Sequence, residues 1–118
     1  MPARILIVDD DARFRALARA LLETSGYAVA GEAADGAEAL AAVSQLRPDA
    51  ALVDVQLPDT NGLALARRLA EGDHGLRIVL TSTDPTLVTA AALAESGALA
   101  FVPKDELAVT DLARWLDG

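Results

Sequence analysis

The chain has 118 residues and a formal net charge of −8, and 53% of its residues are hydrophobic although only 3% are aromatic. This length is typical of one domain with an aliphatic core, and the acidity argues against binding of nucleic acid or anionic membrane by this domain itself. There is no cysteine for a disulfide or thiolate metal site, and we recognise neither a signal peptide nor an apolar segment of the roughly 20 residues that span a bilayer. We therefore expect residues 1–118 to form one soluble, cytoplasmic domain.

Short apolar runs alternate along the chain with stretches of helical periodicity. Strands are predicted over residues 5–8, 27–33, 50–53, 78–81 and 100–102. Helices are predicted over residues 12–25, 37–46, 63–70, 85–96 and 106–116. Strands that alternate with helices through short loops indicate an α/β protein with a doubly wound parallel sheet, covered by helices on both faces.

Several residues at the expected helix ends support these boundaries. Asp11 and Asp35 are suited to cap the first two helices, because a short carboxylate accepts hydrogen bonds from exposed main-chain amides. Asp84 followed by Pro85 is a strong start signal for the fourth helix, and Gly26 and Gly97 are suited to end helices.

Polar side chains follow four of the five predicted strands. They are Asp9, Asp10 and Asp11 after the first strand, Asp54 after the third, Thr81 to Thr83 at the fourth, and Lys104 after the fifth. Each has an ordinary explanation when taken alone, as a cap, a turn residue or a surface residue. Together they converge on the carboxyl edge of the sheet, where parallel α/β proteins bind their ligands. The end of the second strand, residues 32–35, is interpreted as an ordinary turn.

Carboxylates in such a cluster need a cation. Two of them about 5 Å apart repel by roughly 3 kcal/mol at an effective dielectric constant of 20. Lys104 supplies one positive charge, and the all-oxygen set of Asp9, Asp10 and Asp54 is suited to Mg²⁺. Mg²⁺ beside a carboxylate, a hydroxyl and a lysine is suited to phosphoryl transfer, in which a carboxylate becomes an acyl phosphate.

The sequence lacks the motifs that several other kinds of active site require. We find no phosphate-binding glycine loop and no serine-hydrolase elbow. The single histidine, His74, is predicted to lie in an exposed loop, and Trp115 is expected to pack in the last helix.

The sequence resembles the receiver domain of two-component response regulators over nearly its whole length. The resemblance depends on V-D-D at residues 8–10, D-x-x-L-P-x-x-x-G at 54–62, Thr81, and F-V-P-K at 101–104. The stretches at residues 31–36 and 97–107 are most similar to receivers of the LuxR/NarL type. The resemblance implies a flavodoxin-like (CheY-like) sheet with strand order 2-1-3-4-5.

It also implies residue roles. Asp54 would accept a phosphoryl group from a sensor histidine kinase or a histidine phosphotransfer protein, as a signalling domain rather than an enzyme. Mg²⁺ would be held by Asp9, Asp10, Asp54 and the main-chain carbonyl of Gln56. Thr81 and Lys104 would contact the phosphoryl group. Thr81 and Phe101 would then switch the surface of residues 84–116, through which the chain could also form a homodimer. Gly62 would end the loop in a conformation that glycine tolerates best.

Some features depart from the family pattern and leave alternatives open. Phe101 lacks the phenolic hydroxyl of a tyrosine switch, and Pro103 precedes Lys104 where many relatives have proline after the lysine. The chain is either a stand-alone receiver or the regulatory half of a DNA-binding transcription factor cut at residue 118. An unphosphorylated pseudo-receiver that acts as an interaction module is disfavoured by the intact Asp10, Asp54, Thr81 and Lys104. A phosphohydrolase is disfavoured by Gln56, where such enzymes commonly place a second aspartate.

Overall fold

A five-stranded parallel sheet with strand order β2-β1-β3-β4-β5 forms the centre of the computed structural model, which describes residues 2–72 and 75–117. The predicted position of His74 lies outside these residues. Along the chain the elements are β1 (Arg4–Val8), α1 (Ala12–Thr24), β2 (Ala28–Ala33), α2 (Gly36–Leu46), β3 (Ala50–Asp54), α3 (Gly62–Gly72), β4 (Arg77–Ser82), the 3₁₀ turn η1 (Pro85–Leu87), α4 (Ala90–Ser96), β5 (Ala100–Pro103), the 3₁₀ segment η2 (Lys104–Val109) and α5 (Ala113–Leu116). The flavodoxin-like order and the helical cover on both faces are confirmed.

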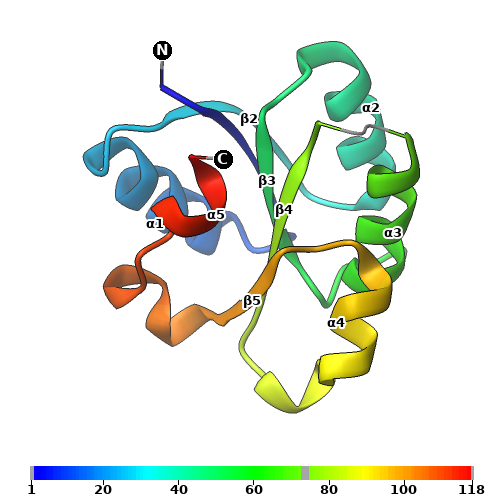
Figure 1. The fold of residues 1–118 in the computed structure, drawn as a ribbon. Coiled ribbons are helices and arrows are strands. Elements are labelled where there is room, and N and C mark those ends of the chain that lie inside the picture. Colours follow the sequence, from blue (N-terminus) through cyan, green and yellow to red (C-terminus); the bar gives the residue numbers. More distant parts are fainter. Residues whose placement is uncertain (1, 73–74, 118) are drawn as a thin grey trace.

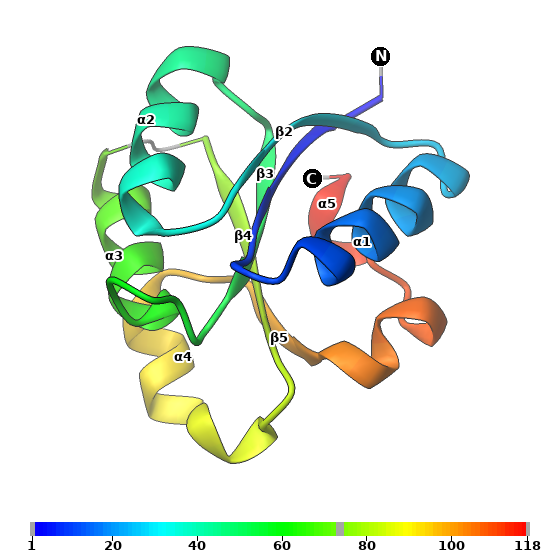
Figure 2. The same cartoon turned by 180° about the vertical axis from the view of Figure 1, so that it is seen from behind.

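The sheet separates two apolar cores because alternate residues of each strand point to opposite faces. Helices α2, α3 and α4 lie on one face, and α1 and α5 lie on the other (Figures 1 and 2). In β1, Leu6 and Val8 belong to the core under α2 and α3, whereas Ile5 and Ile7 belong to the core under α1 and α5. The continuous apolar run of β1 therefore reflects burial on both faces, as expected for a central parallel strand.

The caps of the first two helices form as predicted. Asp11 accepts hydrogen bonds from the amides of Arg13 (2.9 Å) and Phe14 (3.4 Å). Asp35 accepts one from the amide of Glu38 (2.8 Å). Gly26 and Gly97, just beyond α1 and α4, have φ values of 95° and 80°, in the left-handed region that favours glycine.

The prediction of one continuous helix over residues 85–96 is wrong. Asp84 does cap a helical turn at Pro85, by accepting from the amide of Thr86 (2.9 Å), but this turn is a 3₁₀ helix that ends at Leu87. Val88 is extended, and Thr89 starts α4 by accepting a hydrogen bond from the amide of Ala92 (3.0 Å). The second cap interrupts the helix, because a capping residue has non-helical backbone angles.

The prediction of one helix over residues 106–116 is also wrong. The chain forms η2 and then the short α5, separated at Thr110, whose backbone is extended. The Thr110 hydroxyl donates to the carbonyl of Glu106 (2.6 Å), and Asp111 accepts from the amide of Ala113 (3.2 Å). These side-chain bonds compete with helical main-chain bonds, as Thr and Asp commonly do.

Candidate functional site

The strand order brings the predicted site residues together at the carboxyl edge of the sheet. Asp9 and Asp10 follow β1, Asp54 ends β3, and Thr81 lies in β4. Because β1, β3 and β4 are neighbours, these ends lie side by side, with Asp54 directly paired to Thr81 in the register. Lys104 follows β5 at the edge of the same group.

Three carboxylates form the centre of the site. One oxygen from each of Asp9, Asp10 and Asp54 lies within 4.8 Å of the others. Asp9 is fully buried and Asp54 is 5% exposed, whereas Asp10 is exposed. One oxygen of Asp9 accepts from the amide of Asp11 (2.9 Å), and one of Asp54 accepts from the amide of Gln56 (3.1 Å). Each buried carboxylate therefore has a fixed orientation, and its second oxygen faces the cluster.

The ammonium group of Lys104 lies between the two buried carboxylates. Its Nζ is 2.7 Å from Asp9 Oδ2 and 3.4 Å from Asp54 Oδ2. Burial alone would lower the pKa of Lys104, but the two carboxylates outweigh it and raise the pKa. Burial raises the pKa of Asp54, with a further contribution from Asp9, against the lowering effects of the Gln56 amide and Lys104. The pKa of Asp54 is therefore above its ordinary value, because burial and the negative charge of Asp9 outweigh the Gln56 amide and Lys104.

Thr81 places a hydroxyl beside this cluster. Its side chain is fully buried, and its Oγ1 has no hydrogen-bond partner among the described residues. Buried polar atoms in folded proteins nearly always have a partner. The unpartnered hydroxyl therefore fits a site that receives an oxygen-rich group.

Phe101 and Gln56 lie at the margin of the cluster. Phe101 is half-buried in β5, opposite Leu80, and packs against the core under α2 and α3. Gln56 is exposed and forms an isolated antiparallel bridge with Asn61, which closes the loop after β3. These placements leave the predicted roles of both residues as predictions.

The prediction that Gly62 adopts a backbone conformation favoured by glycine is wrong. Its φ is not positive; positive values among the described glycines belong to Gly26 and Gly97. Instead, a Cβ at Gly62 would collide with the main-chain carbonyl of Asp54 and lie 2.7 Å from the Cα of Val55. The Gly62 amide also donates to the carbonyl of Val55 (2.7 Å). Glycine is required here because the loop returns so close to the Asp54 main chain.

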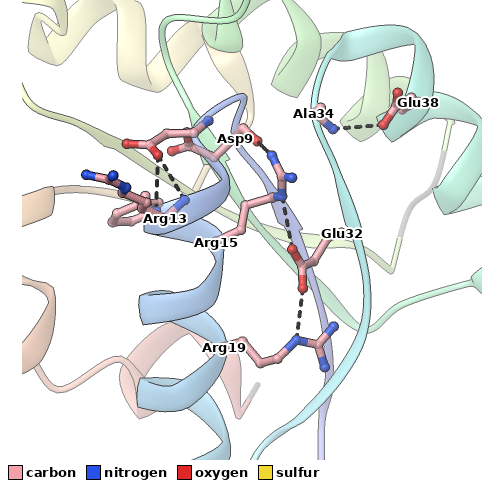
Figure 3. A network of polar contacts seen from close by, with 9 residues as sticks. Asp9, Arg13, Arg15, Arg19, Glu32, Ala34 and Glu38 are labelled. Carbon is pink, nitrogen blue, oxygen red and sulfur yellow. Dashed lines mark hydrogen bonds and ion pairs between the residues drawn. The ribbon is translucent and has the colours of Figure 1, made fainter.

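A charged network behind the cluster was not predicted. Arg15 of α1 donates to the main-chain carbonyl of Asp9 (2.7 Å) and pairs with Glu32 (3.0 Å), and Arg19 pairs with the other oxygen of Glu32 (2.9 Å) (Figure 3). Burial would raise the pKa of Glu32, but the two arginines hold it below its ordinary value. The interpretation of residues 32–35 as an ordinary turn is therefore wrong for Glu32, which lies within β2.

Asp59 connects the loop after β3 to α2. Its two carboxylate oxygens accept from the amides of Gly36 (2.8 Å) and Ala37 (3.1 Å), at the first turn of that helix. These hydrogen bonds, that from Gly36 first, lower the pKa of Asp59. No role is predicted for Asp59 from the sequence, and its contact joins segments 23 positions apart.

Residues 5–114 match the family model described as the response regulator receiver domain. The chain is 42% identical over 105 residues to the response regulator MprA of Mycobacterium sp. (strain KMS), covering 88% of this chain and 45% of MprA. It is 32% identical over 104 residues to the chemotaxis protein CheY of Thermotoga maritima, covering 88% and 87% of the two chains. The crystal structure of a LuxR-family two-component response regulator from Aurantimonas sp. superposes with a TM-score of 0.85 and 32% identity, covering 97% and 81% of the chains.

The chain spans less than half the length of several curated relatives that it matches, MprA among them. None of the helices in the described part of the chain is long and apolar enough to cross a membrane.

Proposed function

The chain belongs to the response regulator receiver family of two-component signalling, and on that premise we propose that Asp54 accepts a phosphoryl group and thereby switches a surface of the domain. The observation that carries this proposal is the surroundings of the Asp54 carboxylate. It is buried, lies 3.4 Å from the only lysine of the chain, and is paired in the sheet with a threonine whose hydroxyl has no partner among the described residues.

The proposed reaction transfers the phosphoryl group from a histidine of a sensor kinase or phosphotransfer protein. A carboxylate oxygen of Asp54 forms a bond to phosphorus, the bond from phosphorus to the imidazole nitrogen breaks, and its electron pair stays with the imidazole. Lys104 neutralises charge on the phosphoryl oxygens, and the Thr81 hydroxyl donates a hydrogen bond to one of them. Lys104 is already positioned beside Asp54 before the reaction, which is how electrostatic stabilisation lowers a barrier.

The donor set also fits Mg²⁺. Asp9, Asp10, Asp54 and the main-chain carbonyl of Gln56 would hold the ion, and the carboxylates present only oxygen atoms, the ligands that this ion prefers. When bound, Mg²⁺ supplies positive charge to the phosphoryl oxygens. It would also offset the repulsion among three carboxylates that Lys104 alone does not balance.

Phosphorylation would change the surface formed by α4, β5 and α5. Thr81 would move toward the phosphoryl group, and Phe101 on the neighbouring strand would follow it. Leu87, Leu99 and Val109, in or beside these elements, are exposed apolar residues that a partner or a second copy of the chain would cover. We propose that residues 1–118 act as one cytoplasmic receiver domain of the LuxR/NarL type, which the LuxR-family structure supports.

Acetyl phosphate with Mg²⁺ tests the central proposal. We expect intact-protein mass spectrometry to show one added phosphoryl group, and Asp54→Ala to abolish it. Asp49→Ala is the matched control, because this aspartate follows α2 near the opposite edge of the sheet, and it should be phosphorylated like the parent chain. Modification that persists in Asp54→Ala would contradict the assignment of the acceptor.

Asp10→Ala separates the metal site from the acceptor. Asp10 is exposed, so its loss should leave the fold intact while lowering Mg²⁺ affinity, measured by calorimetry. Unchanged affinity would remove Asp10 from the metal site. Absence of both phosphorylation and Mg²⁺ binding in the parent chain would favour the alternative of an unphosphorylated interaction module.

A further inference from the structure

The ring of Phe14 lies against the ammonium group of Lys104. Lys104 Nζ is 4.2 Å from the centroid of the ring, well within the range in which a cation is attracted to an aromatic face. Phe14 belongs to the first turn of α1, ninety positions before Lys104 in the chain. The contact therefore depends on the fold and is not a local feature of the sequence.

Phe14 is held firmly by the core on its other sides. It is 8% exposed and belongs to the same buried cluster as Leu107, which lies in the 3₁₀ segment that Lys104 begins. A ring fixed in this way has little freedom to turn, because interiors are close-packed. It therefore presents a rigid face to the lysine.

The three neighbours of the ammonium group differ in chemistry. Lys104 Nζ forms an ion pair with Asp9 at 2.7 Å and donates a hydrogen bond to Asp54 at 3.4 Å. The ring attracts a cation without a formal charge and without an oxygen acceptor. It can therefore restrain the ammonium group without occupying any of its three N–H donors, which bind oxygen.

We propose that Phe14 is a positioning residue for Lys104, which keeps the ammonium group beside the Asp9 and Asp54 carboxylates so that it meets an incoming phosphoryl oxygen. Lysine has a long flexible stem and a strongly hydrated head that otherwise favours water. With Phe14 in place, the side chain of Lys104 is only 14% exposed. The kinetic consequence rests on the proposed phosphorylation of Asp54; the restraint of the lysine does not.

Fluorinated phenylalanines at position 14 test the electrostatic part of this role. Each added fluorine withdraws electron density from the ring face with little change of size, so 4-fluoro, 3,5-difluoro and 3,4,5-trifluoro rings attract the ammonium progressively less. We expect the rate of phosphorylation by acetyl phosphate, at saturating Mg²⁺, to fall in that order, by up to about tenfold in all. The same series in a Lys104→Met background should be flat, because the partner is absent.

A core variant on the same helix is the control for packing. Leu22 is 1% exposed and belongs to the same cluster, but it lies eight residues further along α1, about 12 Å away at the usual helical rise. Leu22→Val should lower the free energy of unfolding and leave the phosphorylation rate unchanged. The proposal would be overturned if the phosphorylation rate did not change across the fluorinated variants and instead followed only their free energies of unfolding.

A direct view of the lysine keeps this test separate from that of phosphorylation. Since Lys104 is the only lysine, ¹³C-labelled lysine gives one set of ε-methylene signals without assignment. We expect these protons to be shifted upfield by the Phe14 ring, and Phe14→Leu to return them to the position found in unfolded chain. An unshifted signal in the folded parent would overturn the restraint, whether or not Asp54 is phosphorylated.

Discussion

At the carboxyl edge of the sheet three carboxylates gather around one lysine, whereas at the amino edge the charged groups have separate partners. There, Asp49 accepts a hydrogen bond from the Arg4 amide (2.8 Å), and Arg77 donates to the carbonyl of Leu116 (2.8 Å). The Tyr27 hydroxyl donates to Asp117 (2.7 Å). In Figure 1 this edge includes the beginning of β1 and the end of α5.

This difference in the pairing of charges indicates that the two edges have different roles. Interactions at the amino edge connect the ends of the chain to the sheet and stabilise the fold. The carboxyl edge holds like charges together, which lowers the stability of the fold. Such destabilising clusters are typical of functional sites, where the charged groups are needed for chemistry. Removing a carboxylate should therefore raise stability at the carboxyl edge and lower it at the amino edge.

The largest effect is expected from Lys104→Met. It leaves Asp9 and Asp54 buried without their cation, and removing one partner from a buried ion pair costs about 3 kcal/mol. We expect the free energy of unfolding in urea, without Mg²⁺, to fall by roughly this amount. Saturating Mg²⁺ should restore part of the loss by supplying positive charge. An unchanged unfolding curve would show that the lysine does not compensate the carboxylates.

A smaller effect, and one of opposite sign, is expected from Asp54→Asn, which should raise the free energy of unfolding. This change removes one of the mutually repelling carboxylates while keeping the side-chain shape, so we expect unfolding without Mg²⁺ to require about 1 kcal/mol more. The matched change at the other edge, Asp49→Ala, loses the hydrogen bond from Arg4 and should lower stability by about 1 kcal/mol. Effects of the same sign in both variants would break the contrast between the edges.

Tyr27 gives an effect of similar size that also depends on pH. Burial raises its pKa to about 12, and the hydrogen bond and negative charge of Asp117 act in the same direction. Because the folded protein holds this proton more tightly, the contribution of Tyr27 is fully present below pH 10.0, the ordinary pKa, and is lost as pH rises through the folded value.

The single tyrosine of the chain makes this measurable. The absorbance of tyrosinate should appear later in the titration of the folded protein than in urea. Tyr27→Phe should be less stable than the parent by about 1 kcal/mol at neutral pH, with unchanged phosphorylation of Asp54. A tyrosinate midpoint at the ordinary pKa in folded protein would contradict the contact with Asp117.

The sequence was sufficient for features that depend on local pattern. Apolar runs placed the strands, the caps at Asp11 and Asp35 placed two helix starts, and the polar strand ends placed the carboxyl-edge cluster. It failed at residues 88–89 and 110–111, where threonine and aspartate side chains bond to the main chain and interrupt a helix that periodicity alone would continue.

Contacts between distant segments that lie outside the strand-end pattern could not be predicted. Nothing near Phe14 in the sequence signals that its ring lies against Lys104, and nothing near Glu32 signals that two arginines of α1 hold it. The motif indicates that glycine matters at position 62, but the predicted reason was a special backbone conformation. The actual reason is the close approach to Asp54, which exists only in the folded loop. Such features require the three-dimensional arrangement of the chain.

The buried hydroxyl of Thr81 has a thermodynamic consequence for the resting protein. An unsatisfied buried polar atom costs about 1–3 kcal/mol, and this one lies in the interior of a central strand of the sheet. In the proposed phosphorylated state, a phosphoryl oxygen that accepts the hydrogen bond of Thr81 would remove this cost and so favour that state. A difference of this size corresponds to a factor of roughly 5 to 150 in the ratio of the two states.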